Sequence, residues 1–275
     1  MLSLNTNMTS LIVQKNLAAA TKGLNSALEK LTSGFKINHA KDDPANYAVM
    51  KNIQAKLSSW EVAENNMMIG SCMLETASSN AELIQNHITR IRDLCEQSVN
   101  GTYGEDSIKA IKSEISSRLE EINRIRRSTD FNGIKLFGEL SENGDIIPKT
   151  INIQVGIDSS SSSRIGIDTS LALPDLNDFE NLDITNPNIL DRIDGALSEL
   201  SIYQVKIAAS SNRLEYAMDS AEVTTRNLTS SLSTIRDADI AKVSSDFVKF
   251  QIMQQACATL LATANQMPAL ALQLL

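Results

Sequence analysis

An imidazole and two carboxylates lie close together in the stretch NHAKDDPAN, the first place where the sequence could support chemistry. His39 lies three residues before Asp42 and four before Asp43, so the group could hold a metal ion or serve acid–base catalysis. No third ligand is near, and Pro44 directly after Asp43 is typical of a turn that ends in a helix cap. We therefore expect the aspartates to start a helix, with no metal and no cofactor.

The three cysteines are the other reactive side chains. Cys72, Cys95 and Cys257 are odd in number and widely spaced, and no CxxC motif or His pair accompanies them. Neither a disulfide framework nor a zinc site is indicated, so we expect three small, buried apolar residues. An exposed Cys95 would instead be able to cross-link the protein. No set of nucleophile, base and oxyanion donor can be assembled from the sequence, so we expect no enzyme.

Composition points to long packed helices. Of the 275 residues, 42% are hydrophobic but only 4% are aromatic, so most burial has to come from aliphatic stripes. The formal net charge is −8, and no long run of Lys or Arg is present. Binding to nucleic acid or to anionic lipid is therefore not expected. The apolar closing segment is interrupted by polar residues and predicts no membrane span.

Heptad spacing is the strongest pattern in the sequence. From Ile193 to Ile235, apolar and small polar residues step by four and three, which is typical of a coiled-coil seam. Asn186 and Pro187 supply an N-cap and a first-turn proline, so this helix is expected to begin there. The seam consists of Ile193, Leu197, Leu200, Gln204, Ile207, Ser211, Leu214, Met218, Ala221, Thr225, Leu228, Leu232 and Ile235.

Shorter seams precede this helix. Asp43 and Pro44 open a helix that runs through Trp60. Farther on, the glycine-rich turn NGTYGEDS, with Asp106 and Ser107 as candidate caps, separates two seams and predicts two antiparallel helices beside the later one. The seams are Ile84, Ile88, Ile91 and Cys95, then Ile108, Ile111, Ile115, Ile122 and Ile125.

The middle of the sequence changes from helical to alternating periodicity. Ile151, Ile153, Val155 and Ile157 alternate with polar residues, and RIGID follows a run of serines, so residues 150–169 predict a β-hairpin with a solvated serine turn. The expected fold class is therefore mainly α: a long antiparallel helical hairpin or coiled-coil rod with a small β-hairpin region.

Both ends of the sequence lack charged side chains. None occurs in residues 1–14 or 250–275, although both ends show helical apolar spacing. The spacing follows Val13, Leu17, Ala20, Leu24, Ala27 and Leu31 at one end, and Val243, Phe247, Phe250, Gln254, Cys257, Leu261 and Ala264 at the other. We expect the ends to pack together and to be helical in an assembly. In a free monomer we expect disorder, because burying one face does not offset the entropy of ordering them.

An uncharged end suits a fully buried interface, because burying an unpaired Lys or Glu is costly. A heterologous contact that repeats head to tail makes an open helical polymer in which neighbours bury the ends of every copy. The sequence therefore predicts a filament subunit. The residues expected to carry polymerisation are Leu17, Leu24, Leu31, Phe247, Phe250 and Leu261.

Three ordered motifs resemble bacterial flagellins. The run LTSGFKINHAKDDPANYAV resembles their N-terminal signature, STDFNGIKLF the loop before their hairpin, and ATANQMPALALQLL their C-terminal end. The resemblance covers all but about residues 138–186 and implies a short form without variable outer domains. It implies an inner coiled-coil domain from residues 1–43 and 236–275, a core helical domain from 44–140 and 187–235, and a β-hairpin with a short connection over 141–186.

The resemblance also implies a function and partners. The chain would be a structural subunit of the flagellar filament, used for motility and exported by the flagellar type III route, which suits a start without a Sec-type signal. Expected partners are copies of itself, a flagellar export chaperone, and hook-associated and cap proteins. The KDDPAN motif also resembles the hook-filament junction protein, which is the nearest alternative; a flagellin serving mainly as a host-receptor ligand is another.

The stretch ITRIRDLCEQSVNGTY resembles the core helix that host Toll-like receptor 5 recognises in agonist flagellins. The resemblance implies Arg90 as a hydrogen-bonding anchor, Leu94 as an apolar contact and Glu114 as a contribution from the facing helix. Thr89 stands where agonists usually carry Gln, and Cys95 with Glu96 where they usually carry two small apolar residues.

Overall fold

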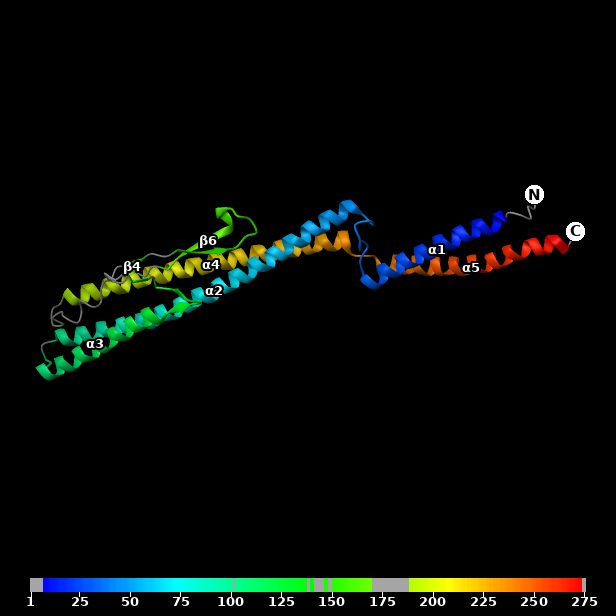
Figure 1. Ribbon diagram of the computed structural model, residues 1–275. Coiled ribbons are helices and arrows are strands. Elements are labelled where there is room, and N and C mark those ends of the chain that lie inside the picture. The colour runs from blue at the N-terminus through cyan, green and yellow to red at the C-terminus, as the bar shows by residue number, and fades with distance from the viewer. Residues whose placement is uncertain are drawn as a thin grey trace. The chain divides into compact units, whose positions relative to one another are not determined.

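Most of the chain is helical in the computed structural model, which describes residues 7–100, 102–137, 139–140, 146–147, 150–169 and 188–273. The long helices are α1 (Met8–Ser33), α2 (Pro44–Val99), α3 (Glu105–Ser128), α4 (Asn188–Arg236) and α5 (Ile240–Gln273) (Figure 1). Short strand pairs lie between α3 and α4 in the sequence. The predicted fold class, mainly α with a small β-hairpin region, is confirmed. In the described part of the chain, no helix is both long and apolar enough to cross a membrane.

The chain divides into two compact units. One combines the chain up to Leu57 with the chain from Arg226 onward, and the other is Ser58–Thr225. We call them the terminal unit and the core unit. The domain limits predicted from the sequence, at residues 43 and 236, stay a prediction.

Hydrogen bonds to two aspartates fix the start of α2. Asp43 accepts one from the backbone N–H of Asn46 at 3.0 Å, and Asp42 accepts one from the backbone N–H of His39 at 2.9 Å. These hydrogen bonds are the main reason why the pKa of each carboxyl lies below its usual value. His39 instead contacts Glu29 at 2.8 Å. The described residues contain no cluster of His, Cys, Asp and Glu suited to a metal ion.

Helix α2 is longer than its separate sequence patterns suggested. The predicted helix through Trp60 and the seam from Ile84 to Cys95 are parts of one helix of 56 residues. The intervening residues bury Met67, Leu74 and other apolar side chains on the same face, so the helix has packing partners along that stretch.

The starts of α3 and α4 were also predicted from the sequence. Helix α3 begins at Glu105 with Gly104 at its N-cap, so the prediction that Asp106 and Ser107 are caps was wrong. Both lie in the first turn, where the carboxylate of Asp106 still interacts favourably with the helix dipole. Helix α4 begins at Asn188. The predicted cap at 186–187 lies outside the described residues.

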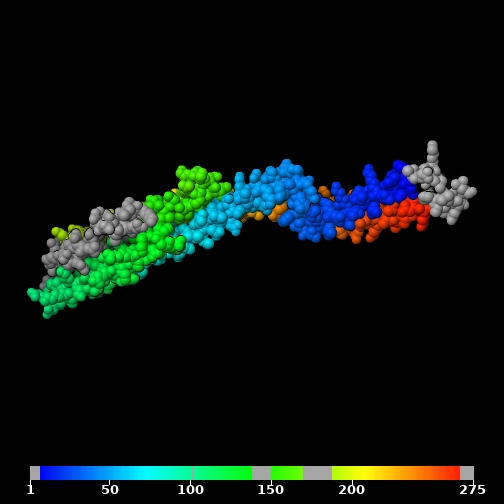
Figure 2. Space-filling view, viewed as in Figure 1, coloured from blue at the N-terminus to red at the C-terminus, as the bar shows by residue number. Residues whose placement is uncertain are grey.

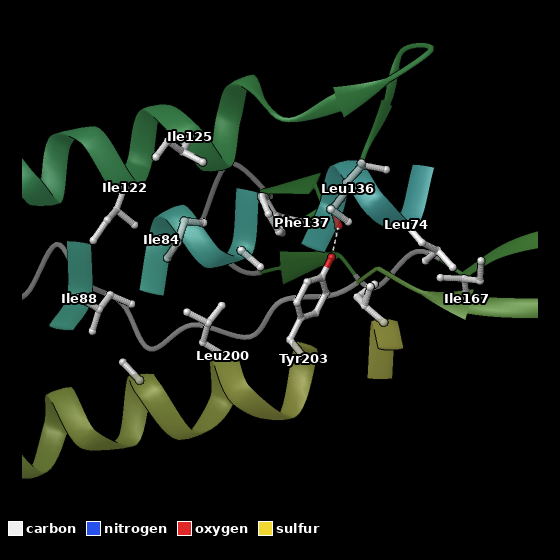
Figure 3. Packing of buried hydrophobic residues seen from close by; sticks show 14 of the residues in the cluster. Leu74, Ile84, Ile88, Ile122, Ile125, Leu136, Phe137, Ile167, Leu200 and Tyr203 are labelled. Carbon is white, nitrogen blue, oxygen red and sulfur yellow. Dashed lines mark hydrogen bonds between the residues drawn. The ribbon is translucent and has the colours of Figure 1, made fainter. Parts of the chain in front are cut away.

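Helices α2, α3 and α4 share one apolar core in the core unit. Ile84 and Ile88 of α2 belong to the same cluster as Ile122 of α3 and Leu200 of α4, and each is at most 2% exposed (Figure 3). Burying one such side chain contributes about 1.5–3 kcal/mol. Every position of the predicted seam from Ile193 to Ile235 is buried or half-buried. The prediction of three helices packed through aliphatic seams is therefore confirmed.

The predicted β-hairpin is present in the core unit. Strand β5 (Thr150–Gln154) pairs antiparallel with β6 (Arg164–Asp168), with Ile153 opposite Ile165. The apolar side of this hairpin joins the helical core through Ile153, Ile165 and Ile167. The serine run differs from a simple solvated turn, because Ser161–Ser163 form one 3₁₀ turn in which Ser163 is buried.

Shorter strand pairs come before this hairpin. Strand β1 (Asp130–Phe131) pairs with β2 (Ile134–Lys135), and β3 (Glu139–Leu140) pairs with β4 (Ile146–Ile147). The β1–β2 turn consists of Asn132 and Gly133, both with positive φ, as a tight hairpin turn requires. Leu136 and Phe137 directly follow and are buried in the core.

A buried tyrosine ties this loop to α4. The Tyr203 hydroxyl donates a hydrogen bond to the Leu136 carbonyl at 2.8 Å, and its ring lies 5.7 Å from that of Phe137 (Figure 3). The pKa of Tyr203 is raised, mainly by burial, so the hydroxyl stays protonated and acts as the hydrogen-bond donor.

Replacing Tyr203 by phenylalanine is expected to destabilise the core unit by about 1–2 kcal/mol, because it removes a buried hydrogen bond. Urea unfolding followed by the fluorescence of Trp60 measures this, since Trp60 is the only tryptophan and packs against the same core. Tyr216→Phe is the matched control because Tyr216 is 75% exposed. Its effect should stay within about 0.5 kcal/mol. Equal effects of the two substitutions would contradict the prediction.

Candidate assembly interface

The terminal helices α1 and α5 pack along each other, as predicted from the sequence. Their atoms lie side by side in Figure 2, with α1 in blue and α5 in orange to red. Every described position of the two predicted seams is buried or half-buried, and Ala20, Ala27, Cys257 and Ala264 are the most enclosed. Disorder of these ends in a free monomer stays a prediction.

Polar side chains link the two helices near their outer ends. The Asn7 side chain donates a hydrogen bond to the Ala264 carbonyl at 2.7 Å, and the Ser10 hydroxyl donates one to the Asn265 side chain at 3.0 Å. Asn7 also caps α1, because its side chain accepts a hydrogen bond from the backbone N–H of Ser10. These uncharged groups satisfy one another without placing a charge in the interface.

A glycine of α1 receives an aromatic side chain of α5. The Phe250 ring lies directly on Gly23, and a Cβ atom at Gly23 would come within 2.6–2.7 Å of three ring carbons. No side chain could occupy that position without displacing the ring. Gly23 therefore forms a hole in α1 that fits one residue of α5.

Several large apolar side chains of α1 and α5 remain exposed. Leu28 is 47% exposed on α1, and Ile252 and Leu260 are 60% and 57% exposed on α5. Single exposed apolar residues are common, so a set of them on two paired helices is a candidate for an interaction surface. We define the outer face as Met8, Leu11, Ile12, Leu28, Val248, Ile252, Met253 and Leu260.

The residues predicted to carry polymerisation lie on the other side of these helices. Leu17, Leu24, Leu31, Phe247, Phe250 and Leu261 are half-buried, in the seam between α1 and α5 of the same chain. Sequence reasoning followed the heptad spacing and so found the seam, but it missed the outer face. The available signal was that residues 1–14 and 250–275 lack charged side chains on every side of the helix, so these stretches have no charged face to turn toward water.

The structure brings together two of the predicted receptor-site residues. Arg90 of α2 lies 3.5 Å from Glu114 of α3, and Glu114 also pairs with Arg118 at 3.0 Å. The Arg118 hydrogen bond, followed by the charge of Arg90, holds the pKa of Glu114 below its usual value. Thr89 is exposed next to Arg90. Arg90 and Glu114 remain partly exposed, at 44% and 40% of their side chains.

Leu94 is a correction to the predicted site. Its side chain is 2% exposed in the core cluster, so it does not present an apolar contact at the surface. Because α2 packs against both α3 and α4, a wider part of its surface is buried. That part includes Leu94 as well as Cys95.

Arg92 links the same stretch of α2 to α4. It contacts Asp194 at 2.7 Å and Glu96 at 3.5 Å. The hydrogen bond to Asp194 is the main cause that raises the pKa of Arg92 above its usual value. This ion pair joins α2 to α4 two residues from Arg90.

The cysteines follow the sequence prediction in two of three cases. Cys95 and Cys257 are buried, whereas Cys72 is exposed, so its predicted burial was wrong. Cys72 lies on the outward face of α2, one helical turn after Ile69, which is 54% exposed. The next residue, Met73, is 4% exposed because it lies on the side of the helix that packs into the core. Burial raises the pKa of the Cys95 thiol to about 11, which makes it unreactive at neutral pH.

Known proteins resemble this chain over most of its length. Residues 4–141 match the family described as bacterial flagellin N-terminal helical region, and residues 190–275 match the bacterial flagellin C-terminal helical region. The chain is 31% identical to a flagellin of Halalkalibacterium halodurans and 31% identical to a flagellin of Bacillus subtilis, with 99% of each chain covered in both comparisons. It is also 31% identical to the flagellar filament 33 kDa core protein of Treponema phagedenis over 96% of both chains.

Solved structures of other flagellar proteins also resemble the chain. The crystal structure of Bacillus cereus flagellin is similar with a TM-score of 0.48 and 20% identity, covering 57% of this chain and 88% of that one. A putative flagellar hook-associated protein from Vibrio parahaemolyticus is similar with a TM-score of 0.41 and 12% identity, covering 84% and 99%.

Proposed function

Because the chain belongs to the bacterial flagellin family, we propose that it is a structural subunit that polymerises with its own copies into the flagellar filament for motility. The observation that carries this proposal is the outer face of α1 and α5, where large apolar side chains are about half exposed in one chain. A polymer would bury this face against neighbouring copies. Burial of that kind is the main favourable term in protein association.

The proposal assigns different roles to different parts of the chain. Residues 1–43 and 236–275 would form an inner coiled-coil domain that supplies most of the contacts between copies. Residues 44–140 and 187–235 would form the core helical domain, with 141–186 as its hairpin and short connection. The self-contained apolar core of α2, α3 and α4 supports this division, because such a core can fold before assembly.

We propose further partners on the same grounds. A flagellar export chaperone would cover the apolar face that the terminal helices expose before assembly. Hook-associated and cap proteins would contact the subunits at the two ends of the filament. Secretion by the flagellar type III route into an extracellular filament belongs to the same proposal. The hook-filament junction protein is a weaker alternative, because the three relatives described above match along nearly their whole length and are named flagellins or a filament core protein.

Seeded polymerisation of the purified full-length chain tests the main proposal. Light scattering should rise after seeds are added, and negative-stain electron microscopy should show long filaments. A chain that stays monomeric over a wide range of concentration and salt would contradict the proposal. It would instead favour a flagellin that serves mainly as a host-receptor ligand.

A receptor role is a second proposal, supported by the approach of Arg90 to Glu114 on an exposed surface. We propose that host Toll-like receptor 5 contacts Thr89, Arg90 and Glu114. Leu94 would act only by packing the helix beneath them, since its side chain is buried.

Replacing Arg90 by alanine is expected to weaken binding to the purified receptor ectodomain about thirtyfold, the effect of losing a hot-spot arginine worth about 2 kcal/mol. The fold should not change, because Glu114 keeps its ion pair with Arg118. Arg124→Ala is the matched control, since Arg124 also pairs with a glutamate on α3 but lies outside the proposed contact. Surface plasmon resonance with immobilised receptor measures both variants. Equal affinities would contradict the receptor proposal and leave the filament proposal untouched.

A further inference from the structure

The β1–β2 turn of the core unit contains an asparagine followed by a glycine, a pair that is chemically labile. Asn132 and Gly133 are its two central residues, because the neighbouring Phe131 and Ile134 pair with each other. Their φ values are 50° and 78°, as in a type I′ turn. Both residues are exposed, so water reaches them.

An asparagine that precedes a glycine can lose its side-chain amide without an enzyme. The backbone nitrogen of the glycine attacks the asparagine Cγ and forms a new N–Cγ bond, and Nδ2 leaves as ammonia with the proton from that backbone nitrogen. Water then opens the resulting five-membered succinimide ring at one of its two carbonyl groups. One opening yields aspartate. The other yields isoaspartate, in which the main chain runs through the former side chain. Glycine hinders the attack least because it has no side chain.

The type I′ conformation keeps the reacting atoms apart. Ring closure requires the Gly133 nitrogen and the Asn132 Cβ to lie on the same side of the Cα–C bond of Asn132. A type I′ turn has a ψ of about 30° at its first central residue, which places these two atoms on nearly opposite sides of that bond. The Gly133 N–H also donates a hydrogen bond to the Asp130 carboxylate at 3.3 Å. The attack therefore requires the turn to open.

Contacts next to the turn keep it closed. Leu136 is fully buried, its backbone N–H donates to the Thr129 carbonyl at 3.3 Å, and its carbonyl accepts the hydrogen bond from the Tyr203 hydroxyl. The Lys135 ammonium donates to the Arg127 carbonyl at 2.6 Å. Because these contacts join the strand pair to α3 and α4, opening the turn requires part of the core unit to loosen.

We propose that Asn132 is a modification site that the folded core unit protects: it deamidates only while the β1–β2 turn is open, and the isoaspartate product then prevents the turn from closing. Isoaspartate lengthens the main chain by one carbon, so Phe131 and Ile134 no longer pair across a two-residue turn. Aspartate still fits, because Asp-Gly suits a type I′ turn as Asn-Gly does. The inference concerns a single chain and does not depend on polymerisation.

Mass spectrometry of tryptic peptides measures the reaction in the full-length chain. The peptide 128–135 contains Asn132 as its only asparagine, and the peptide 93–109 contains only Asn100. Asn100 is also followed by a glycine in the sequence, but it lies exposed directly after α2 and in no strand pair. It therefore serves as an internal control for the same chemistry.

The purified chain is incubated at neutral pH with and without denaturing guanidinium chloride. Asn132 should deamidate at least about tenfold more slowly in the native chain than in denaturant, because only the open fraction reacts. In denaturant, Asn132 and Asn100 should react at similar rates. Tyr203→Phe should raise the native rate at Asn132 about tenfold, the factor that 1.4 kcal/mol of lost stability gives, and leave Asn100 unchanged. Asp130→Ala should also raise it, since it removes the acceptor of the Gly133 N–H.

Three results would overturn the inference. Equal rates at Asn132 in the native and the unfolded chain would show that the turn gives no protection. An unchanged rate in both Tyr203→Phe and Asp130→Ala would show that opening of the turn does not control the reaction. The third result concerns the product. Chains with isoaspartate at position 132, separated by chromatography, should unfold at a lower denaturant concentration than the Asn132→Asp variant, and equal midpoints would show that isoaspartate does not hold the turn open.

Discussion

Filaments are expected to stop forming when Ile252 and Leu260 are both replaced by lysine. Both side chains belong to the outer face of α5 and do not pack in the seam with α1, so a single chain tolerates the change. In a polymer the same positions would be buried, and an unpaired ammonium there costs several kcal/mol at each copy. Because each subunit would bear this cost at every contact, polymerisation should fail completely.

The measurement is seeded assembly, followed by light scattering and negative-stain electron microscopy. A chain that ends at Phe250 serves as the reference for full loss, because it lacks most of α5. Ser245→Lys is the matched control, since Ser245 is exposed on α5 but lies among existing charges at Lys242, Asp246 and Lys249. It should leave assembly nearly unchanged. Filaments from the double lysine variant would show that the outer face is not the interface between copies.

A substitution in the seam tests the same assembly assay from the other side of the helix. Replacing Leu261 by alanine should weaken the α1–α5 pair within one chain and so slow assembly, without abolishing it. The expected order is therefore a partial effect from the seam and a complete effect from the outer face. The reverse order would restore the original prediction that the seam residues carry the contacts between copies.

Replacing Gly70 by valine is expected to destabilise the core unit by about 1–3 kcal/mol, the usual cost of overpacking a core. Gly70 lies on α2 where strand β5 packs against it, and a Cβ there would come within 2.3 Å of the Ile153 Cδ1 and 3.3 Å of the Leu214 Cδ1. Valine adds two further methyl groups in the same space. The hairpin or the helix has to move, and both belong to one apolar core.

Gly195 is the matched control for this substitution. It also lies inside a long helix, α4, but a Cβ there meets no atom within 4 Å. Gly195→Val should therefore be neutral or slightly stabilising, because valine has a higher helix propensity than glycine. Urea unfolding followed by Trp60 fluorescence compares the two variants directly.

A second substitution locates the cause. If the clash with Ile153 is responsible, Ile153→Ala should cost less in the Gly70→Val background than in the parent chain, since it opens space for the added methyl groups. Additive effects of the two substitutions, or equal effects of Gly70→Val and Gly195→Val, would contradict the proposed packing of the hairpin on α2.

Local sequence signals determined the elements of this protein. Heptad and alternating periodicities identified the helical seams and the β5–β6 hairpin, because the period of the apolar residues follows directly from helix and strand geometry. Asp43 before Pro44 correctly identified the start of α2, since a cap is a contact between residues close in sequence. The uncharged ends also indicated correctly that the termini pack together.

Only the tertiary structure decided which faces point outward and which distant residues meet. Leu94 is buried and Cys72 is exposed because α2 has two helical neighbours, and a single helix pattern does not contain their positions. The outer face of α5 differs from its seam only through contact with α1, since both are apolar and uncharged. The close contact between Gly70 and Ile153 depends on segments about 80 residues apart, whose approach is set by the packing of the hairpin on α2.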